Sequence, residues 1–371
     1  MRRRALARAG IGLVAVTAVA LAAAGCTARA REGGSQSAKF PKKVTVVVPF
    51  AAGGGTDIWA RLIASSLHPL LPGDPSLQVQ NLPGGEGIPA NNRFANQDPA
   101  DGTRILAGTG SSYIPALLRE KGVKYDFRNM TPLISNGTGS VIYVTKASGI
   151  KNADGLFTHH ADLRYGGISA TGSDLGALIT FDLLKLSVKA TFGFEGRGPV
   201  ALALQRGELN IDHQTTSVYN ESVKPLVDKG DAVPLMTYGV LDPKTGKIVR
   251  DPNFPNLPTV PEVYKKHFGK APSGPAYDAY RIFGVALYAF EKTLWAKPGT
   301  PKAITQPYVD AVAGLTKDKK FQQSRTKALG DYPLVQGSEV ADVTKQVFNI
   351  SPGVRGYVAD LLKSKYHTSI E

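Results

Sequence analysis

A run of β-branched residues ends in a proline and three consecutive glycines, and a helical pattern then begins: VTVVVPFAAGGGTDIWARLIASSL, residues 44–67. Glycines let the backbone come close to a ligand, and Thr56 or Asp57 can cap the helix. A helix N-terminus binds anions through its free N–H groups and its dipole. Because the stretch contains no Lys and its glycines are not spaced, it is neither a Walker loop nor a dinucleotide fingerprint. Taken alone, it is equally compatible with a turn that only reverses the chain.

Two further strand-to-helix junctions have the same character. One is GTGSS at residues 108–112, and the other is SATGSD at residues 169–174. In an open parallel sheet such loops emerge at the carboxyl ends of the strands, where ligands bind. Their backbone amides and small hydroxyls suit a carboxylate, although helix capping explains any single Ser or Thr equally well. The candidate ligand-binding residues are Phe50, Ala51, Ala52, Gly53, Gly54, Thr56 and Asp57 in the first loop, Gly108, Thr109, Gly110 and Ser111 in the second, and Ser169, Ala170, Thr171, Gly172 and Ser173 in the third.

The usual catalytic constellations are missing from the sequence. It contains no Gly-x-Ser-x-Gly elbow, and the single Cys lies in the N-terminal segment. The six His are scattered, and His159-His160 are adjacent in a segment that we expect to be an exposed loop rather than a metal site. The sequence therefore favours binding over catalysis, with no metal and no cofactor.

The N-terminus is typical of the leader of an exported protein. Arginines at positions 2–4 and 8 precede an apolar run, residues 11–24, that is too short to span a bilayer. The run ends in Ala-Ala-Gly-Cys, the form of a bacterial lipoprotein signal, so we expect cleavage after residue 25 and a lipid on Cys26. The alternative is that Cys26 is an incidental small residue. Residues 26–40 are expected to be a tether, and the protein to lie on the outer side of the cytoplasmic membrane.

Size and charge restrict the class of protein further. Removing residues 1–25 leaves 346 residues, more than one core usually serves, so two lobes are expected. The net charge falls from +14 to +10, because the leader carries four Arg and no acidic residue. The remaining charge is spread thinly, without blocks of Lys or Arg between aromatic residues, which argues against nucleic acid. With one Cys there is no internal disulfide, and we expect a monomer.

Strand-like and helix-like segments alternate along the chain, which predicts an α/β fold with a mostly parallel sheet. Residues 241–275 are rich in Pro and Gly and are expected to form an irregular connection. The expected strands are 44–49, 77–81, 104–108, 141–146, 163–167, 209–212 and 282–289, and the expected helices are 58–70, 91–95, 113–120, 175–184, 200–206, 301–315, 319–329 and 338–362, the last interrupted at Pro352.

The N-terminal half also matches a family pattern in order and spacing. Residues 44–67 and the segment VQNLPGGEGIPANNRFANQDPADGTRILAGTGS follow a strand, Pro-Phe-x-x-Gly-Gly-x-x-Asp, an Asn-x-Pro-Gly-x-x-Gly turn and a Pro-x-Asp-Gly-x-x-Leu-x-x-Gly strand. The chain thereby resembles the substrate-binding proteins of tripartite tricarboxylate transporters, the Bug family. Segments such as PNLPTVPEV and AKPGTP extend the likeness more weakly. The departures are Phe194 for a usual Tyr, Glu195 for a usual Lys, Asn210 for a usual Asp, Gln214-Thr215 for Asp-Asn, and a longer segment at 272–281.

The resemblance implies a two-lobed fold of the periplasmic-binding-protein type (type II, a Venus flytrap), with the ligand between two α/β lobes. Lobe 1 would comprise residues 41–142 and 241–371, and lobe 2 residues 143–240. In this family the first Gly-rich loop and the Ser/Thr-rich loop of the second lobe grip a carboxylate, partly through ordered waters. Gln214 falls near the site, and Arg197 is a candidate anchor for a distal carboxylate, or else a solvated loop residue.

The function expected from the resemblance is that of a lipid-anchored receptor that delivers a small organic acid to a membrane permease. Di- and tricarboxylates, aromatic carboxylates, and acidic or amidated amino acids are the candidate ligands. Two alternatives are an exported α/β enzyme acting on a carboxylate or ester, and a ligand sensor of the same fold.

Overall fold

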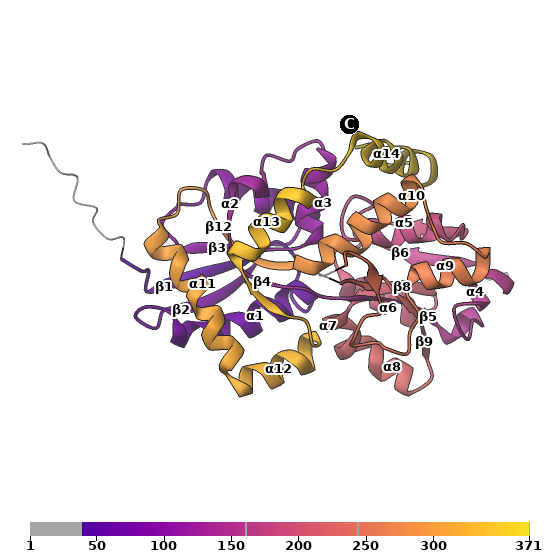
Figure 1. The fold of residues 1–371 in the computed structure, drawn as a ribbon, viewed down its shortest axis with the longest axis horizontal. Coiled ribbons are helices and arrows are strands. Elements are labelled where there is room, and N and C mark those ends of the chain that lie inside the picture. The colour runs from indigo at the N-terminus through magenta and orange to yellow at the C-terminus, as the bar shows by residue number, and fades with distance from the viewer. Residues whose placement is uncertain (1–38, 160–161, 243–244, 371) are drawn as a thin grey trace, which may run out of the picture. The chain divides into compact units, whose positions relative to one another are not determined.

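The computed structural model describes residues 39–159, 162–242 and 245–370. Cys26, the leader and most of the tether lie outside the described residues, as does His160. Within the described part, two sets of strands organise the chain into two lobes (Figure 1).

The first lobe is built on a six-stranded sheet in the order β13-β4-β12-β3-β1-β2. Alternate residues of β1 face two different cores: Val44, Val46 and Val48 pack on one side, and Val47 packs on the other. Helices α1, α11 and α12 cover the first face, and α2, α3 and α13 contribute to the core on the second. The strands are β1 (Lys43–Val48), β2 (Ser76–Asn81), β3 (Arg104–Gly108), β4 (Thr131–Asn136), β12 (Lys292–Ala296) and β13 (Leu334–Gln336). The helices are α1 (Gly55–Leu67), α2 (Ile88–Asn96), α3 (Gly110–Leu118), α11 (Lys302–Lys317), α12 (Lys319–Leu329) and α13 (Gly337–Val347).

The second lobe has a three-stranded sheet in the order β8-β5-β9 and a separate parallel pair, β6-β7. In the central strand β5, Val141 and Tyr143 pack with α6, whereas Ile142 and Val144 belong to the core that contains α5. The strands are β5 (Ser140–Thr145), β6 (Leu163–Gly166), β7 (Val188–Thr191), β8 (Ile211–Thr215) and β9 (Ala232–Thr237). The helices are α4 (Gly155–Thr158), α5 (Leu175–Leu183), α6 (Arg197–Gln205), α7 (Thr216–Val218) and α8 (Lys224–Asp228).

Two expectations about the sheets are wrong. Only β2, β1 and β3 run parallel in the large sheet, whereas β12, β4 and β13 are antiparallel to their neighbours, as are β8, β5 and β9. Residues 282–289 are not a strand but lie in two short helical segments, Tyr280–Val285 and Ala286–Phe290. A short apolar run does not distinguish a buried strand from a buried helix by periodicity. The strand expected in this region begins only after these two helical segments, as β12.

The segment expected to be an irregular connection contains regular elements that pack on the second lobe. It forms the β10 (Val240–Leu241) and β11 (Ile248–Val249) pair, followed by α9 (Val260–Phe268) and α10 (Pro275–Ala279). Helix α9 contacts β9, and α10 contacts α5. A capping box between Thr259 and Glu262 starts α9, so local side-chain bonds specify this helix among the prolines.

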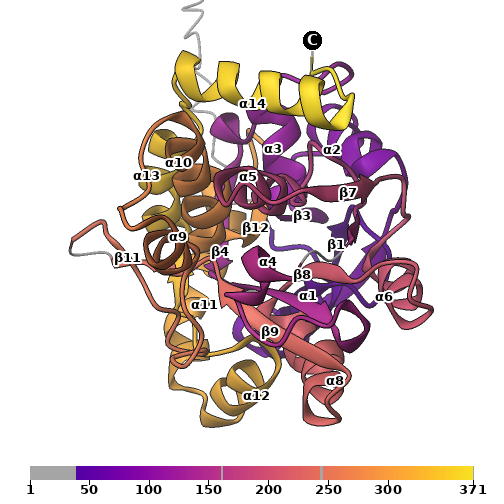
Figure 2. The ribbon, with the colours of Figure 1, turned by 90° about the vertical axis from the view of Figure 1, so that its right-hand side faces the viewer.

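The C-terminal helix α14 (Pro352–Tyr366) packs on α10 of the second lobe and also lies beside α3 of the first (Figure 2). The helical segment expected at 338–362 is interrupted before Pro352, as predicted: α13 ends at Val347, and Ser351 caps α14 by accepting from the Val354 N–H. Tyr357 Oη and Lys365 Nζ each bond the Asp182 carboxylate of α5 at 2.5 Å. The chain end thus fastens to an element that precedes it by more than 160 residues.

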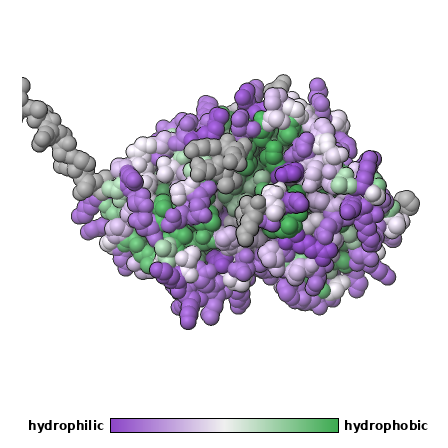
Figure 3. Space-filling view, viewed as in Figure 1, coloured by the Kyte–Doolittle hydropathy of each residue, from purple (hydrophilic) through white to green (hydrophobic). Residues whose placement is uncertain are grey.

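The surface of the described part is mixed in character. Hydrophilic residues predominate on the face shown in Figure 3, with apolar patches among them. Among the residues that the structure describes, no helix has the length and apolar composition needed to cross a membrane.

Candidate functional site

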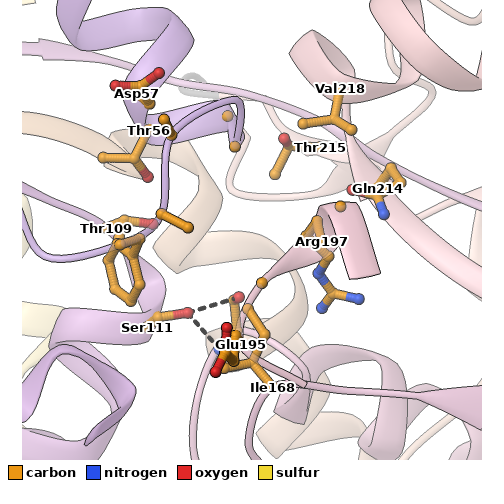
Figure 4. A pocket seen from close by; sticks show the side chains of 18 of the residues that line it. Thr56, Asp57, Thr109, Ser111, Ile168, Glu195, Arg197, Gln214, Thr215 and Val218 are labelled. Carbon is orange, nitrogen blue, oxygen red and sulfur yellow. Dashed lines mark hydrogen bonds between the residues drawn. The ribbon is translucent and has the colours of Figure 1, made fainter. Parts of the chain in front are cut away.

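A cavity of about 130 Å³ lies where loops of the two lobes meet (Figure 4). Its volume is comparable to the roughly 150 Å³ of an engineered cavity that accommodates benzene. The first lobe lines it with the loop after β1, the start of α1, the β3-α3 loop and the start of β12. The second lobe contributes the loop after β6, the start of α6, and β8.

Most of the predicted first loop lines this cavity, together with parts of the other two loops. The predicted residues on its wall are Phe50, Ala51, Ala52, Gly54, Thr56, Asp57, Thr109, Ser111, Ser173, Arg197 and Gln214. The predicted residues that do not line it are Gly53, Gly108, Gly110, Ser169, Ala170, Thr171 and Gly172.

The N-terminus of α1 opens onto the cavity without a side-chain cap. Gly54 is the N-cap residue, and no described side chain accepts from the first turn. Asp57 is turned toward its own loop, where it accepts from the Gly53 N–H at 3.0 Å and from Arg61 Nε at 3.0 Å. Burial raises the pKa of Asp57, but these hydrogen bonds outweigh burial and the net pKa is lowered. The amides of Gly55 and Thr56 therefore remain available to a ligand.

The N-terminus of α3, by contrast, already holds a carboxylate of the chain. Glu291 accepts from Thr109 Oγ1 and from the Gly110 N–H, the latter at 2.6 Å. Lys292 Nζ lies 3.1 Å from Glu291 Oε1 and 3.4 Å from Thr56 Oγ1. The buried Glu291–Lys292 pair occupies the place that the sequence suggested for a ligand on this loop.

Two glycines of that loop have packing roles. A Cβ on Gly108 would lie 2.6 Å from Trp295 Nε1 and 2.9 Å from Tyr113 Oη. A Cβ on Gly110 would lie 2.8 Å from Glu291 Oε2. Both positions need glycine because aromatic or carboxylate atoms pack directly against the backbone.

The third loop folds around a second carboxylate of the chain. Asp174 accepts from the N–H groups of Ile168 at 2.9 Å and Ser169 at 3.2 Å. Ser169 and Thr171 bond each other through their hydroxyls at 2.9 Å. These bonds within the chain occupy most of the loop's polar groups, and of the predicted residues there only Ser173 lines the cavity.

Ser173 instead connects the two lobes. Its hydroxyl lies 2.8 Å from Ser111 Oγ, and its N–H donates to the same oxygen at 3.1 Å (Figure 4). Two of the predicted loops are therefore joined directly, at one end of the cavity.

Arg197 is not a solvated loop residue. Its side chain is 13% exposed and forms ion pairs with Asp174 and, at 3.2 Å, with Asp212. Asp212 also accepts from Tyr143 Oη at 2.9 Å and Gln214 Nε2 at 2.8 Å. Both predicted polar residues of this region, Arg197 and Gln214, thus bond buried carboxylates.

Burial sets the protonation of this network. It raises the pKa of Asp212 to about 6. Burial and the nearby Arg197 together lower the pKa of His213 to about 3, so His213 is neutral. For Asp174 burial raises the pKa, but Arg197 together with the hydrogen bonds from Tyr165 Oη and the Ser169 N–H outweighs burial, and the net pKa is lowered.

Sequence reasoning missed half of the lining residues. Glu291 directly precedes β12 and Lys292 begins it, more than 230 residues after the first loop and in a segment without a recognisable motif. Glu195 had a signal, because it stands where the family resemblance expects a Lys. The residues missed are Gly55, Ile168, Glu195, Gly196, Gly198, Pro199, His213, Thr215, Val218, Glu291 and Lys292.

Solved structures resemble this chain over most of its length. The periplasmic binding protein BugD is 21% identical with a TM-score of 0.64, over 88% of this chain and 98% of BugD. The chain has the fold of a periplasmic binding protein. MatC from Rhodopseudomonas palustris, solved with bound malate, is 20% identical with a TM-score of 0.62, over 86% of this chain and 98% of MatC. An R. palustris protein solved with adipate is 21% identical with a TM-score of 0.66, over 86% of this chain and 96% of that protein. No protein-family model and no curated protein sequence matches the chain.

These likenesses confirm the fold class. The two-lobed α/β arrangement that the sequence predicted is that of the periplasmic-binding-protein type.

Proposed function

We propose that this protein is an extracytoplasmic solute receptor of the Bug type that binds a small organic carboxylate between its lobes. The observation that carries the proposal is the uncapped first turn of α1, which opens onto a cavity lined from both lobes. Free N–H groups and the helix dipole at such a position favour an anion. BugD shares the fold, and MatC and the second R. palustris protein were solved with malate and adipate.

In this proposal the ligand carboxylate accepts from the amides of Gly55 and Thr56. Lys292 supports the negative charge, because its Nζ lies 3.4 Å from Thr56 Oγ1. The hydroxyls of Ser111, Ser173 and Thr215 complete the polar lining. Binding through amides and hydroxyls lets the ligand leave unchanged, and we therefore propose a receptor rather than an enzyme.

We propose lobe boundaries that follow the sheets. We place the first crossing at residues 137–139, between β4 and β5, a few residues before the boundary at 142 that the sequence suggested. We place the return crossing at β12 rather than near residue 241, because α9 and α10 pack on elements of the second lobe. The C-terminal helix α14 would then move with the second lobe, through its bonds to Asp182.

The membrane side of the proposal rests on the sequence alone. We propose that Cys26 carries a lipid that anchors the receptor on the outer side of the cytoplasmic membrane, and that a permease receives the ligand. A sensor of the same fold would use a signalling partner in place of the permease.

A thermal-shift screen of organic acids on the purified full chain tests the receptor. An acid at about 100 times its dissociation constant stabilises the folded state by about 2.7 kcal/mol, which raises the melting temperature measurably. Mass spectrometry of the bound acid after incubation separates receptor from enzyme, because a receptor returns it unchanged. A full panel without any shift, or turnover of the bound acid, contradicts the proposal.

A further inference from the structure

A second cavity, of about 770 Å³, lies between α3 of the first lobe and α14 (Figure 2). This α3–α14 cavity is also walled by residues 125–128, which follow α3, and by residues 348–350, which lead from α13 toward α14. Among the described residues, it has no lining residue in common with the cavity at the start of α1. Its charged lining residues are Arg119, Glu120, Asp126, Arg128 and Arg355.

One of the three arginines is already neutralised. Arg128 Nε donates to both carboxylate oxygens of Asp126 at 2.9 Å, and Arg128 Nη2 donates to Asp126 Oδ2 at 2.6 Å. Hydrogen bonds from Arg128 lower the pKa of Asp126, so the carboxylate is ionised at neutral pH. This pair contributes no net charge to the α3–α14 cavity.

The other two arginines have no counterion. In the part of the chain that the structure describes, the side chains of Arg119 and Arg355 form no ion pair and no hydrogen bond. Arg355 Nη1 is moreover buried without a partner. Burial and the charge of Arg119 both lower the pKa of Arg355, so the two guanidinium groups lie close enough to repel each other. A buried donor and a pair of like charges both cost free energy unless an anion compensates them.

Glu120 does not supply this compensation. Its Oε2 atom is buried without a hydrogen-bond partner, and within the described ranges it forms no ion pair with an arginine. Burial and the charge of Glu86 raise the pKa of Glu120, and neither effect is offset by a nearby cation. Glu120 and the two unpaired arginines therefore lie in different parts of the α3–α14 cavity.

The ends of two helices adjoin the unpaired arginines. Arg119 follows the last turn of α3, whose dipole is negative at that end, and Pro352 begins α14, whose dipole is positive there. Both ends line the cavity, so their dipoles oppose each other and the two guanidinium groups decide the sign of the charge.

We infer that Arg119 and Arg355 form a second anion site, which takes a doubly charged tetrahedral oxyanion, a phosphate or sulfate group. Each guanidinium presents a planar fork of N–H donors that engages two oxygens. A tetrahedral oxyanion has oxygens for both forks and two charges for the two cations, whereas one carboxylate has two oxygens and a single charge. The inference is independent of the proposed function, because the two cavities are lined by different residues.

The test is calorimetry on the full chain with inorganic phosphate, sulfate and acetate, at an ionic strength held constant with sodium chloride. We expect phosphate or sulfate to bind, and the tighter of the two identifies the group that the site holds. Arg119→Gln and Arg355→Gln should each weaken this binding about tenfold or more, because each removes a charge-assisted pair of hydrogen bonds. Any binding of acetate should change less.

A matched control separates the site from the general positive charge around it. Lys124 is exposed, directly precedes Tyr125 in the wall and does not itself line the α3–α14 cavity. Lys124→Gln should leave the affinity for phosphate or sulfate unchanged. The melting temperatures of the three variants without anion show whether they are folded.

Three outcomes would overturn the inference. They are the absence of binding by both phosphate and sulfate, an unchanged affinity in folded Arg355→Gln, and an equal loss of affinity in Lys124→Gln. The thermal-shift screen of organic acids judges the carboxylate receptor separately, so either proposal can fail while the other stands.

Discussion

At the scale of single residues, carboxylates of the chain itself accept hydrogen bonds from the backbone N–H groups of two loops next to the cavity. Glu291 occupies the start of α3, and Asp174 occupies the amides of the third loop. Arg197 forms ion pairs with Asp174 and Asp212. Its main role is therefore to offset the charge of two buried carboxylates that would otherwise destabilise the folded state. Among the described residues that line the cavity, the starts of α1 and α6 carry no side-chain cap, and the start of α1 is the position that we propose for the carboxylate of the ligand.

Replacing Arg197 should therefore reduce stability. In Arg197→Met the carboxylates of Asp174 and Asp212 lose their cation, and breaking a buried pair of this kind costs about 3 to 5 kcal/mol. Urea denaturation measures the change in the free energy of unfolding. Arg206→Met is the control, since Arg206 and Glu208 are both exposed and such pairs contribute about 1 kcal/mol or less. Equal losses in the two variants would contradict the buried role of Arg197.

The pH dependence of stability should reveal the buried His213. Its pKa is about 3 in the folded protein and about 6.5 when unfolded, so its stabilising contribution is present above pH 6.5 and is lost as the pH falls toward 3. Asp212 acts in the opposite sense: burial raises its pKa to about 6, so its contribution is present below about pH 4 and is lost as the pH rises through 6.

The two contributions partly cancel in the unmodified protein, and a variant should separate them. His213→Asn keeps a polar partner for Tyr165, whose hydroxyl lies 2.9 Å from His213 Nδ1. Between pH 7 and pH 4 we expect the variant to lose roughly 3 kcal/mol less stability than the unmodified protein. Urea denaturation at a series of pH values gives both curves, and parallel curves would show that His213 does not titrate as inferred.

At the scale of elements, the sequence predicted best where local patterns and turn chemistry agree. Strand β3 and helix α12 begin and end where predicted. Strands β4, β7, β9 and β13 and the short pair β10-β11 were missed, and β12 was placed too early within a long apolar run. The first two predicted loops lie together because β1 and β3 are paired in one sheet, whereas the third loop follows β6 in the second lobe. Lys292 reaches the cavity through the antiparallel pairing of β12 with β3 and β4, which are distant in sequence.

Helix α1 offers a test of how closely its first turn approaches the second lobe. A Cβ on Gly55 would lie 2.9 Å from both Ser217 Oγ and Thr215 Oγ1. Gly55→Ala should push these elements apart and weaken carboxylate binding about tenfold or more, because the amides of this turn are the proposed donors. Its free energy of unfolding should change by less than about 1 kcal/mol, since Ala suits a helix.

A glycine outside the cavity at the start of α1 provides the control for that variant. Gly356 lies in helix α14, does not line that cavity, and no atom lies within 4 Å of a Cβ placed on it. Gly356→Ala should keep its affinity for the best acid of the panel. Calorimetry measures the affinity of both variants for this acid. Equal affinities would show that the second lobe does not approach the first turn of α1 when ligand is bound.

At the scale of the whole molecule, binding is proposed to couple the two lobes. The cavity has walls from both, so a ligand makes its full set of contacts only when the lobes meet. Ser111 and Ser173 contact each other across this junction at 2.8 Å. The contact reports on the closed arrangement without involving α1.

A cysteine pair at this contact should form a disulfide faster when ligand is bound. Cys26 is the only cysteine, so the full chain with Cys26→Ser, Ser111→Cys and Ser173→Cys carries just the engineered pair. We expect the acid with the largest thermal shift to speed oxidation about tenfold, because ligand increases the population in which the thiols meet. Gel mobility of the denatured, non-reduced chain follows the reaction.

Pairing Ser111→Cys with Ser222→Cys, an exposed position away from the cavity, controls for unspecific oxidation and should give no cross-link. Equal rates with and without the acid would mean that ligand does not draw the lobes together, and binding would then use a cavity that is already closed.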